Sequence, residues 1–333
     1  MKKEVPPRIA RFCVIALAAQ FFAVFALAQN VGIGTFNDLV GKTLEQAPSP
    51  TPPPEAVMEF GIAAAEATPC PVPFFSAPTA GWEYDYRLIQ RTDVQGLRLD
   101  VNEAHTSFGF TLASATALSF DYFHAWSDGS NDAGVSQTSA ANGVKATFQR
   151  TIGKHWILAL PVVFQETNAG GSTLLGPNSF TADSYLLYPF IVFKTPLKIT
   201  TQPLLFSLSS GYRAVVTNTA DIHPMAPDIN GWNGTFSTLA RLDYVLNKTV
   251  RLSGSATWNH LTNFDFPKVT PRPDDNAFAL AAGAVFSFGH VSAPCPQGQP
   301  TSPRFTLTVS YQYDGFNRDF YSHSFTAAGS YSF

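Results

Sequence analysis

The strongest constraint on the fold is the strict alternation of side chains in the last ten residues, SFTAAGSYSF. Phe325, Ala327, Gly329, Tyr331 and Phe333 share one parity, and the residues between them are small or polar. Successive side chains of a β-strand point to opposite faces, so this segment predicts a strand with one apolar face and one polar face. Such a strand separates an apolar medium from a polar one.

The composition indicates that the apolar medium is lipid. Charged residues make up 14% of the chain, against about 25% in ordinary soluble domains. After residue 28 no apolar run reaches the roughly 20 residues of a membrane-spanning helix, and the longest covers residues 277–286. In hydrocarbon only helices and closed barrels satisfy their backbone hydrogen bonds. The sequence therefore predicts an all-β transmembrane barrel, and its net charge of −3 gives no reason to expect nucleic acid as a partner.

The alternation is nearly continuous from residue 81 to residue 333 and predicts an antiparallel up-and-down barrel of about twelve strands, with ten or fourteen as alternatives. Short connections, such as residues 113–116, alternate with longer ones, such as residues 127–140 and 167–182. Short periplasmic turns and longer extracellular loops produce this asymmetry. A phase change near residues 102–106 predicts a bulge in the second strand.

The N-terminus has the parts of a secretory signal peptide. The basic residues Lys2, Lys3, Arg8 and Arg11 come first. An apolar stretch over residues 12–27 follows, and Ala26 and Ala28 form a small-x-small cleavage pattern. The stretch is shorter than a spanning helix, so we expect residues 1–28 to be removed by cleavage after Ala28.

Residues 29–80 are rich in proline and predict a stiff periplasmic extension or a plug, ahead of a barrel at residues 81–333. Two segments of the extension have helical patterns, Phe36–Gln46 and residues 55–67. The inward side chains predicted for the barrel are mostly small and leave room for an inserted segment. Residues 55–67, themselves rich in small side chains, are the candidate lumen helix.

Two cysteines of the mature chain share an unusual context. Cys70 and Cys295 each lie between two prolines, and both fall on the periplasmic side of the predicted topology. The periplasm is oxidising, so the sequence predicts a disulfide that ties the extension to the base of the barrel. Two independent free thiols are the alternative.

Charged residues predicted to face the lumen carry both signs. They are the acids Glu83, Asp85, Asp100, Asp121 and Asp243 and the bases Arg87, Arg98, Lys145, Arg213, Arg241 and Arg251. Five acids against six bases leave no dominant sign, whereas a strongly selective pore normally has one. Cross-lumen pairs that stiffen a narrow barrel are therefore favoured over a selectivity ring.

The C-terminal strand, with Tyr331 and the final Phe333, resembles the assembly signal of bacterial outer-membrane proteins. The predicted barrel resembles twelve-stranded outer-membrane barrels, a class that includes autotransporter translocator domains and small substrate-specific channels. The resemblance implies a place in the bacterial outer membrane, with lipid, lipopolysaccharide and the barrel-assembly machinery as partners. About fifty residues lie between Ala28 and the predicted barrel, so export of a passenger domain is not expected.

Residues 260–263 (HLTN) resemble the His-x-Ser-Asn motif of outer-membrane phospholipase and lipid A deacylase barrels, in which a histidine activates a serine. Thr262 stands in the serine position here, and no matching acid or oxyanion donor can be assigned to His260. A girdle histidine beside Trp258 is the simpler interpretation. The other histidines show no metal-ligand spacing, and the sequence has no Gly-rich phosphate loop and no zinc-binding cysteine pattern. We therefore predict no enzyme activity, no metal site and no cofactor.

These observations favour a porin-like barrel that passes small solutes, and they predict a monomer. A non-conducting structural or adhesion barrel that acts through its extracellular loops is the alternative. A lipid-hydrolysing barrel is the third interpretation.

Overall fold

The structure, a computed structural model, describes residues 35–46, 75–91, 98–112, 115–130, 136–173, 176–197, 204–220, 230–247, 249–265, 276–289, 305–315 and 320–333. The predicted signal peptide, the helical segment at 55–67, Cys70 and Cys295 lie outside these residues. Within the described ranges, no helix is long and apolar enough to cross a membrane.

One helix and a series of antiparallel strands make up the described chain. The elements are α2 (Phe36–Gln46), β1 (Phe75–Arg91), β2 (Arg98–Leu112), β3 (Thr116–Ser130), β4 (Ser136–Ile152), β5 (Trp156–Thr173), β6 (Gly176–Leu187), β7 (Phe190–Leu197), β8 (Leu204–Ala220), β9 (Gly231–Val245), β10 (Val250–Asp265), β11 (Asn276–Phe288), β12 (Phe305–Asp314) and β13 (Phe320–Ser332).

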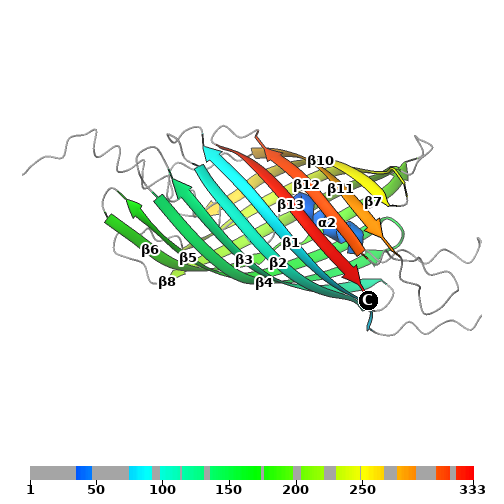
Figure 1. Cartoon of the computed structure of the whole chain (residues 1–333), viewed down its shortest axis with the longest axis horizontal. Coiled ribbons are helices and arrows are strands. Elements are labelled where there is room, and N and C mark those ends of the chain that lie inside the picture. The colour runs from blue at the N-terminus through cyan, green and yellow to red at the C-terminus, as the bar shows by residue number, and fades with distance from the viewer. Residues whose placement is uncertain are drawn as a thin grey trace, which may run out of the picture.

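The strands close into a ring. Apart from β6 and β7, strands that follow one another in the sequence pair with each other, and β13 pairs with β1. β6 and β7 share one position in the ring, because both pair with β5 on one side and with β8 on the other. The wall is therefore a closed, twelve-stranded antiparallel β-barrel (Figure 1), which confirms the predicted fold class and strand count.

The interruption between β6 and β7 lies at Tyr188 and Pro189. Proline has no backbone N–H to contribute to the ladder. The Tyr188 N–H nevertheless donates to the Pro161 carbonyl at 3.0 Å, and the Pro189 carbonyl accepts the Tyr212 N–H at 3.0 Å. The wall thus stays hydrogen-bonded to both neighbouring strands across the break.

The two faces of the wall differ as the alternation predicts. Large apolar side chains point outward, among them Trp82, Phe120 and Val144, each about half exposed. The intervening positions point inward, where Glu83 and Asp121 are buried. In a transmembrane barrel the outward apolar side chains contact lipid, so a half-exposed tryptophan on this surface is stabilised rather than penalised.

The barrel interior holds an apolar cluster as well as polar groups. α2 contributes Phe36, Leu39 and Val40 to it, and the wall contributes side chains such as Phe123 and Val192. Burying these helix side chains gives a short helix the tertiary contacts that it needs, because 11 residues are too few for a stable helix on their own. The bounds of α2 agree with those predicted for the first helical segment.

Two strand details differ from the sequence interpretation. β1 begins at Phe75, ahead of residue 81, where the clear alternation starts. β2 pairs with β3 without any register shift from Arg98 to Leu112, so the bulge predicted near residues 102–106 is wrong. The irregularity lies instead in β1, between Ser76 and Thr79.

Candidate functional site

The site begins with the local sequence that starts α2. Thr35 and Asp38 form a reciprocal cap: the Thr35 hydroxyl accepts the Asp38 N–H at 3.2 Å, and the Thr35 N–H donates to Asp38 Oδ2 at 3.0 Å. This pairing gives acceptors to two backbone N–H groups at the helix N-terminus, those of Thr35 and Asp38. It defines where the first turn of the helix begins.

α2 contacts walls on different sides of the ring. The Phe36 ring stacks on Tyr188 at 5.2 Å and meets Phe190 edge-on at 5.6 Å, at the β6–β7 junction. The Thr43 carbonyl accepts a hydrogen bond from Gln149 Nε2 of β4 at 3.0 Å. On β10, the Ser255 hydroxyl donates to Asn37 Oδ1 at 2.7 Å.

Two ion pairs add further contacts. Lys42 Nζ lies 2.6 Å from Glu83 Oε1 and 2.5 Å from Oε2, on β1. Glu45 Oε1 accepts from Arg251 Nη2 of β10 at 2.9 Å. The described contacts of α2 therefore reach β1, β4, the β6–β7 junction and β10, with β1 and the β6–β7 junction nearly opposite each other in the ring.

The fit against β9 is close. A Cβ atom on Gly41 would lie 2.9 Å from an Arg241 guanidinium nitrogen. That guanidinium is itself held by two hydrogen bonds of 2.9 Å to the Asp243 carboxylate. Val40, one residue earlier, is fully buried. Chemically, the arrangement is a helix docked inside the barrel and held to the wall by apolar packing, ion pairs and hydrogen bonds.

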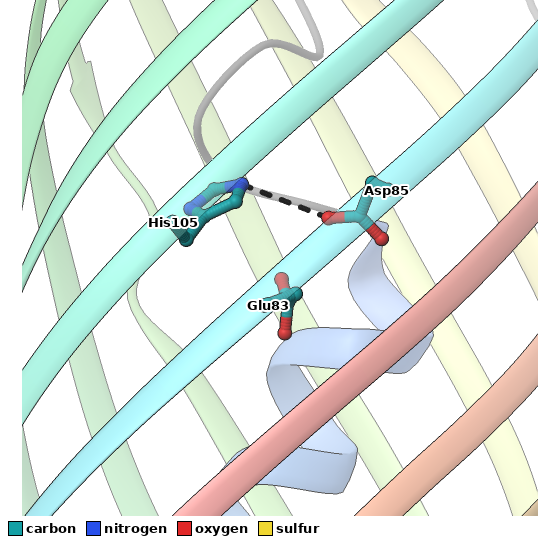
Figure 2. A group of neighbouring side chains, drawn as sticks. All are labelled: Glu83, Asp85 and His105. Atoms are coloured by element: carbon teal, nitrogen blue, oxygen red, sulfur yellow. Dashed lines mark ion pairs between the residues drawn. The ribbon is translucent and has the colours of Figure 1, made fainter.

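A second group of charges lies on the wall beside Lys42. Glu83 and Asp85 of β1 lie directly opposite His105 and Glu103 of β2, respectively. His105 Nε2 lies 3.6 Å from Asp85 Oδ2 and 3.3 Å from Glu103 Oε2. Figure 2 shows the Glu83, Asp85 and His105 side chains converging from the two neighbouring strands.

Asp121 of β3 completes this wall cluster, which we define as Glu83, Asp85, Glu103, His105 and Asp121. Its Oδ1 lies 3.1 Å from His105 Nδ1, and its Oδ2 lies 3.2 Å from Lys145 Nζ of β4. All five side chains are buried. Burying charges is costly unless they are paired. The pairs within the cluster connect β1, β2 and β3, and its lysine partners extend the connection to β4 through Lys145 and to α2 through Lys42.

Comparison of this structure with solved structures finds other proteins with the same barrel architecture. No protein-family model matches the sequence, and no curated protein matches it. The chain is similar to the translocator domain of the autotransporter NalP from Neisseria meningitidis, with 14% identity, a TM-score of 0.59, and coverage of 92% of this chain and 100% of that one. Its fold is that of the bacterial outer-membrane β-barrels.

Two further autotransporter structures are similar to this chain over most of its length. The transport unit of AIDA-I from Escherichia coli has 11% identity and a TM-score of 0.58, with 95% of this chain and 99% of that one covered. The β domain of the Bordetella autotransporter BrkA has 13% identity and a TM-score of 0.57, with 78% and 100% covered. At these identities the likeness concerns the outer-membrane barrel fold alone.

The barrel structure places most of the predicted lumen residues inside. Seven are buried: Glu83, Asp85, Arg87, Asp121, Lys145, Arg241 and Asp243. Arg213 and Arg251 are partly buried at inward positions. Arg213 donates to the Thr235 hydroxyl at 3.3 Å, and Arg251 pairs with Glu45.

The prediction that Arg98 and Asp100 face the lumen is wrong, because both lie on the outward face. Arg98 Nε pairs with Asp100 Oδ2 at 3.0 Å, and the Tyr86 hydroxyl donates to Asp100 at 2.5 Å. The interior positions between and beside them are taken by Leu99 and Val101. These charges lie where β2 begins, at the end of the strand, and a rim position beside water tolerates an outward charge.

Three charged or titratable residues of the site were not predicted from the sequence. Glu103 and His105 lie on the inward face of β2, where the predicted bulge obscured their parity. Lys42 comes from α2, whereas residues 55–67 were the predicted lumen helix. The alternation of β2, taken without a bulge, would have placed Glu103 and His105 inside.

The remaining predicted residues lie on the outside of the barrel. His260 stacks on Trp258 at 5.7 Å and its Nδ1 faces Asn276 Oδ1 at 3.1 Å. Thr262 instead donates to the Gly234 carbonyl at 3.1 Å, so the two members of the motif have different partners. The Tyr331 and Phe333 rings meet edge-on at 5.0 Å, with Phe333 exposed.

Proposed function

We propose that this protein is a porin-like outer-membrane channel for small solutes, which α2 holds closed until the helix is displaced. One observation supports the proposal above others: a single helix reaches wall strands on opposite sides of the ring, from Glu83 on β1 to Tyr188 beside β7. A helix about 10 Å across with its side chains fills a small barrel, so solutes pass only when it moves.

The chemistry of the wall supports passage once the helix has moved. Inward positions carry buried hydroxyl side chains, among them Ser207, Ser209, Ser237 and Thr257. Such a surface holds water and small polar solutes. Besides its apolar packing, the helix is held to this wall by ion pairs and hydrogen bonds, which water can replace, so its displacement has a lower barrier than that of a wholly apolar plug.

The test is conductance in planar bilayers with a charge reversal on the helix. Lys42→Glu places a second carboxylate against Glu83 and repels the helix from β1. Lys154→Glu, in the exposed turn between β4 and β5, changes the net charge equally without touching the helix. We expect rare openings in the wild type and in Lys154→Glu, and frequent discrete openings in Lys42→Glu.

Two outcomes contradict this function. If the wild type conducts as fully as Lys42→Glu, the helix does not close the lumen. If the wild type, Lys42→Glu and Lys154→Glu all fail to conduct, although each resists unfolding in unheated detergent as folded barrels do, the protein is a structural or adhesion barrel that acts through its loops.

The proposal includes the setting of the barrel. We infer an exported, monomeric protein that contacts lipid and lipopolysaccharide, is inserted by the barrel-assembly machinery and catalyses no reaction. Cleavage after Ala28 predicts a mature N-terminus at Gln29, which N-terminal sequencing checks. A Cys70–Cys295 disulfide predicts faster migration of the denatured, non-reduced chain than of the reduced chain, and equal migration argues against the bond.

A further inference from the structure

The wall cluster has the layout of a metal site. Glu83 and Asp85 are two residues apart on β1, and their direct partners across the ladder are His105 and Glu103 on β2. Four side chains with ligand atoms thus form a square on one inward face. Glu83, Asp85 and His105 each offer one ligand atom, and these three atoms lie within 4.8 Å of one another.

The cluster is rich in carboxylates, and one of their oxygens is unsatisfied. Lys42 and Lys145 pair with two of the four carboxylates, those of Glu83 and Asp121. Asp85 is 6% exposed, and its Oδ2 has no hydrogen-bond donor among the described residues. An unsatisfied buried carboxylate oxygen is costly, so this atom is short of a cation.

The ligand spacing suits a divalent transition metal. His105 Nε2 is 3.3 Å from Glu103 Oε2 and 3.6 Å from Asp85 Oδ2. Ligands at about 2.0–2.2 Å from a tetrahedral zinc ion lie roughly 3.3–3.6 Å from one another. These groups therefore need little movement to surround an ion of this size.

The other imidazole nitrogen has the partner that a metal-bound histidine needs. His105 Nδ1 is 3.1 Å from Asp121 Oδ1, and since a carboxylate only accepts, Nδ1 carries the proton. A metal-bound histidine characteristically donates its second N–H to a carboxylate, which fixes the tautomer and the ring orientation. Nε2 is then left for the ion, which replaces its proton.

We propose that the wall cluster binds one Zn²⁺-class divalent transition cation through His105 Nε2 and the Asp85 and Glu83 carboxylates. Glu103 lies within reach as the fourth ligand. Asp121 is a positioning residue that orients His105. Glu83 then bridges the ion and Lys42, with one carboxylate oxygen for each.

The experiment measures zinc binding to the full mature chain, refolded in detergent and stripped of metal with a chelator. We expect one Zn²⁺ per chain, at least tenfold weaker binding in His105→Gln and in Asp85→Asn, and a 10–100-fold loss in Asp121→Asn. The control is His124→Gln, because His124 lies on β3 outside the cluster and faces Asn142. Its binding should equal that of the wild type.

Several results overturn the proposal. These are a wild type that binds no zinc, binding unchanged in both His105→Gln and Asp85→Asn, equal loss in His124→Gln, or displacement of the zinc by millimolar Ca²⁺. X-ray absorption of the zinc-loaded wild type gives a measurement that needs no variant to fold. A shell with one imidazole nitrogen and carboxylate oxygens at about 2.0–2.1 Å supports the site, and a shell without imidazole refutes it.

Discussion

Several wall glycines lie directly opposite aromatic side chains. Gly143 of β4 pairs with Phe123, Gly211 of β8 with Phe190, and Gly329 of β13 with Trp82. A Cβ atom on any of these glycines would collide with the opposing side chain. The aromatic side chain thus covers the glycine and fills the space that a side chain would occupy, as in designed sheets where an aromatic neighbour protects a strand glycine.

Gly143→Val is predicted to lower the free energy of unfolding by about 1–3 kcal/mol, since it forces the buried Phe123 ring out of its place. Urea unfolding in lipid vesicles measures the loss. Gly254→Val is the matched control, because the nearest atom to a Cβ there is the Ala281 carbonyl oxygen at 4.0 Å. Equal effects of the two substitutions would show that Phe123 is not packed on Gly143.

At the scale of the element, α2 depends on its cap and on the wall around it. An isolated helix of 11 residues is marginal in water, so its start is held by the Thr35–Asp38 pair and its body by the lumen contacts. The cap therefore controls how readily the first turn opens.

Thr35→Ala is predicted to destabilise the helix by about 1 kcal/mol, because the Asp38 N–H loses its acceptor. Hydrogen exchange of the α2 amides should then become roughly fivefold faster, which is the rate change that this energy gives. Thr35→Ser keeps a hydroxyl at the same position and should exchange like the wild type. Unchanged exchange in Thr35→Ala would mean that the cap does not limit opening.

At the scale of the whole molecule, the proposed place of the barrel in a membrane sets its apolar outer face against lipid, and the cost of an outward charge should therefore depend on depth. Val144, in the middle of β4, and Ile152, at its end, are both about half exposed on the outer face. The two positions differ in their distance from the membrane midplane.

Val144→Arg is predicted to cost roughly 2–4 kcal/mol of folding free energy and Ile152→Arg roughly 0–1 kcal/mol, because the penalty for a lipid-facing arginine falls from midplane to interface. Urea unfolding in vesicles compares them. A similar cost at both positions would contradict the proposed membrane placement of β4.

Much of this architecture can be predicted from the sequence, because period-two alternation encodes both the strands and their outward faces. The bounds of α2 also follow from the local pattern. Strand ends do not: residues 127–140 and 167–182 were expected to be loops, but β3, β4, β5 and β6 cover most of them. Their polar residues suit strands that extend the barrel beyond the proposed lipid contact, where the outer face would meet water.

The candidate site is harder to predict, because its parts come together only through register and insertion. His105 meets Glu83 across one ladder and Asp121 lies on the next strand, so no linear spacing marks the cluster. The outward pair Arg98 and Asp100 shows the reverse problem. A charge at a strand end can face either way, and only the regular register of β2 decides its side.

The central claim is that α2 is docked inside the barrel, and cysteine cross-linking in intact membranes tests it most directly. In a background without Cys70 and Cys295, Asn37→Cys is combined with Ser255→Cys, because the native Ser255 Oγ lies 2.7 Å from Asn37 Oδ1. In the control pair, Asn37→Cys is combined with Ala256→Cys, at the adjacent outward position. A short thiol-to-thiol cross-linker should join the first pair in most chains and leave the second pair unlinked. Absence of cross-linking in the first pair, or equal cross-linking in both, would contradict the account.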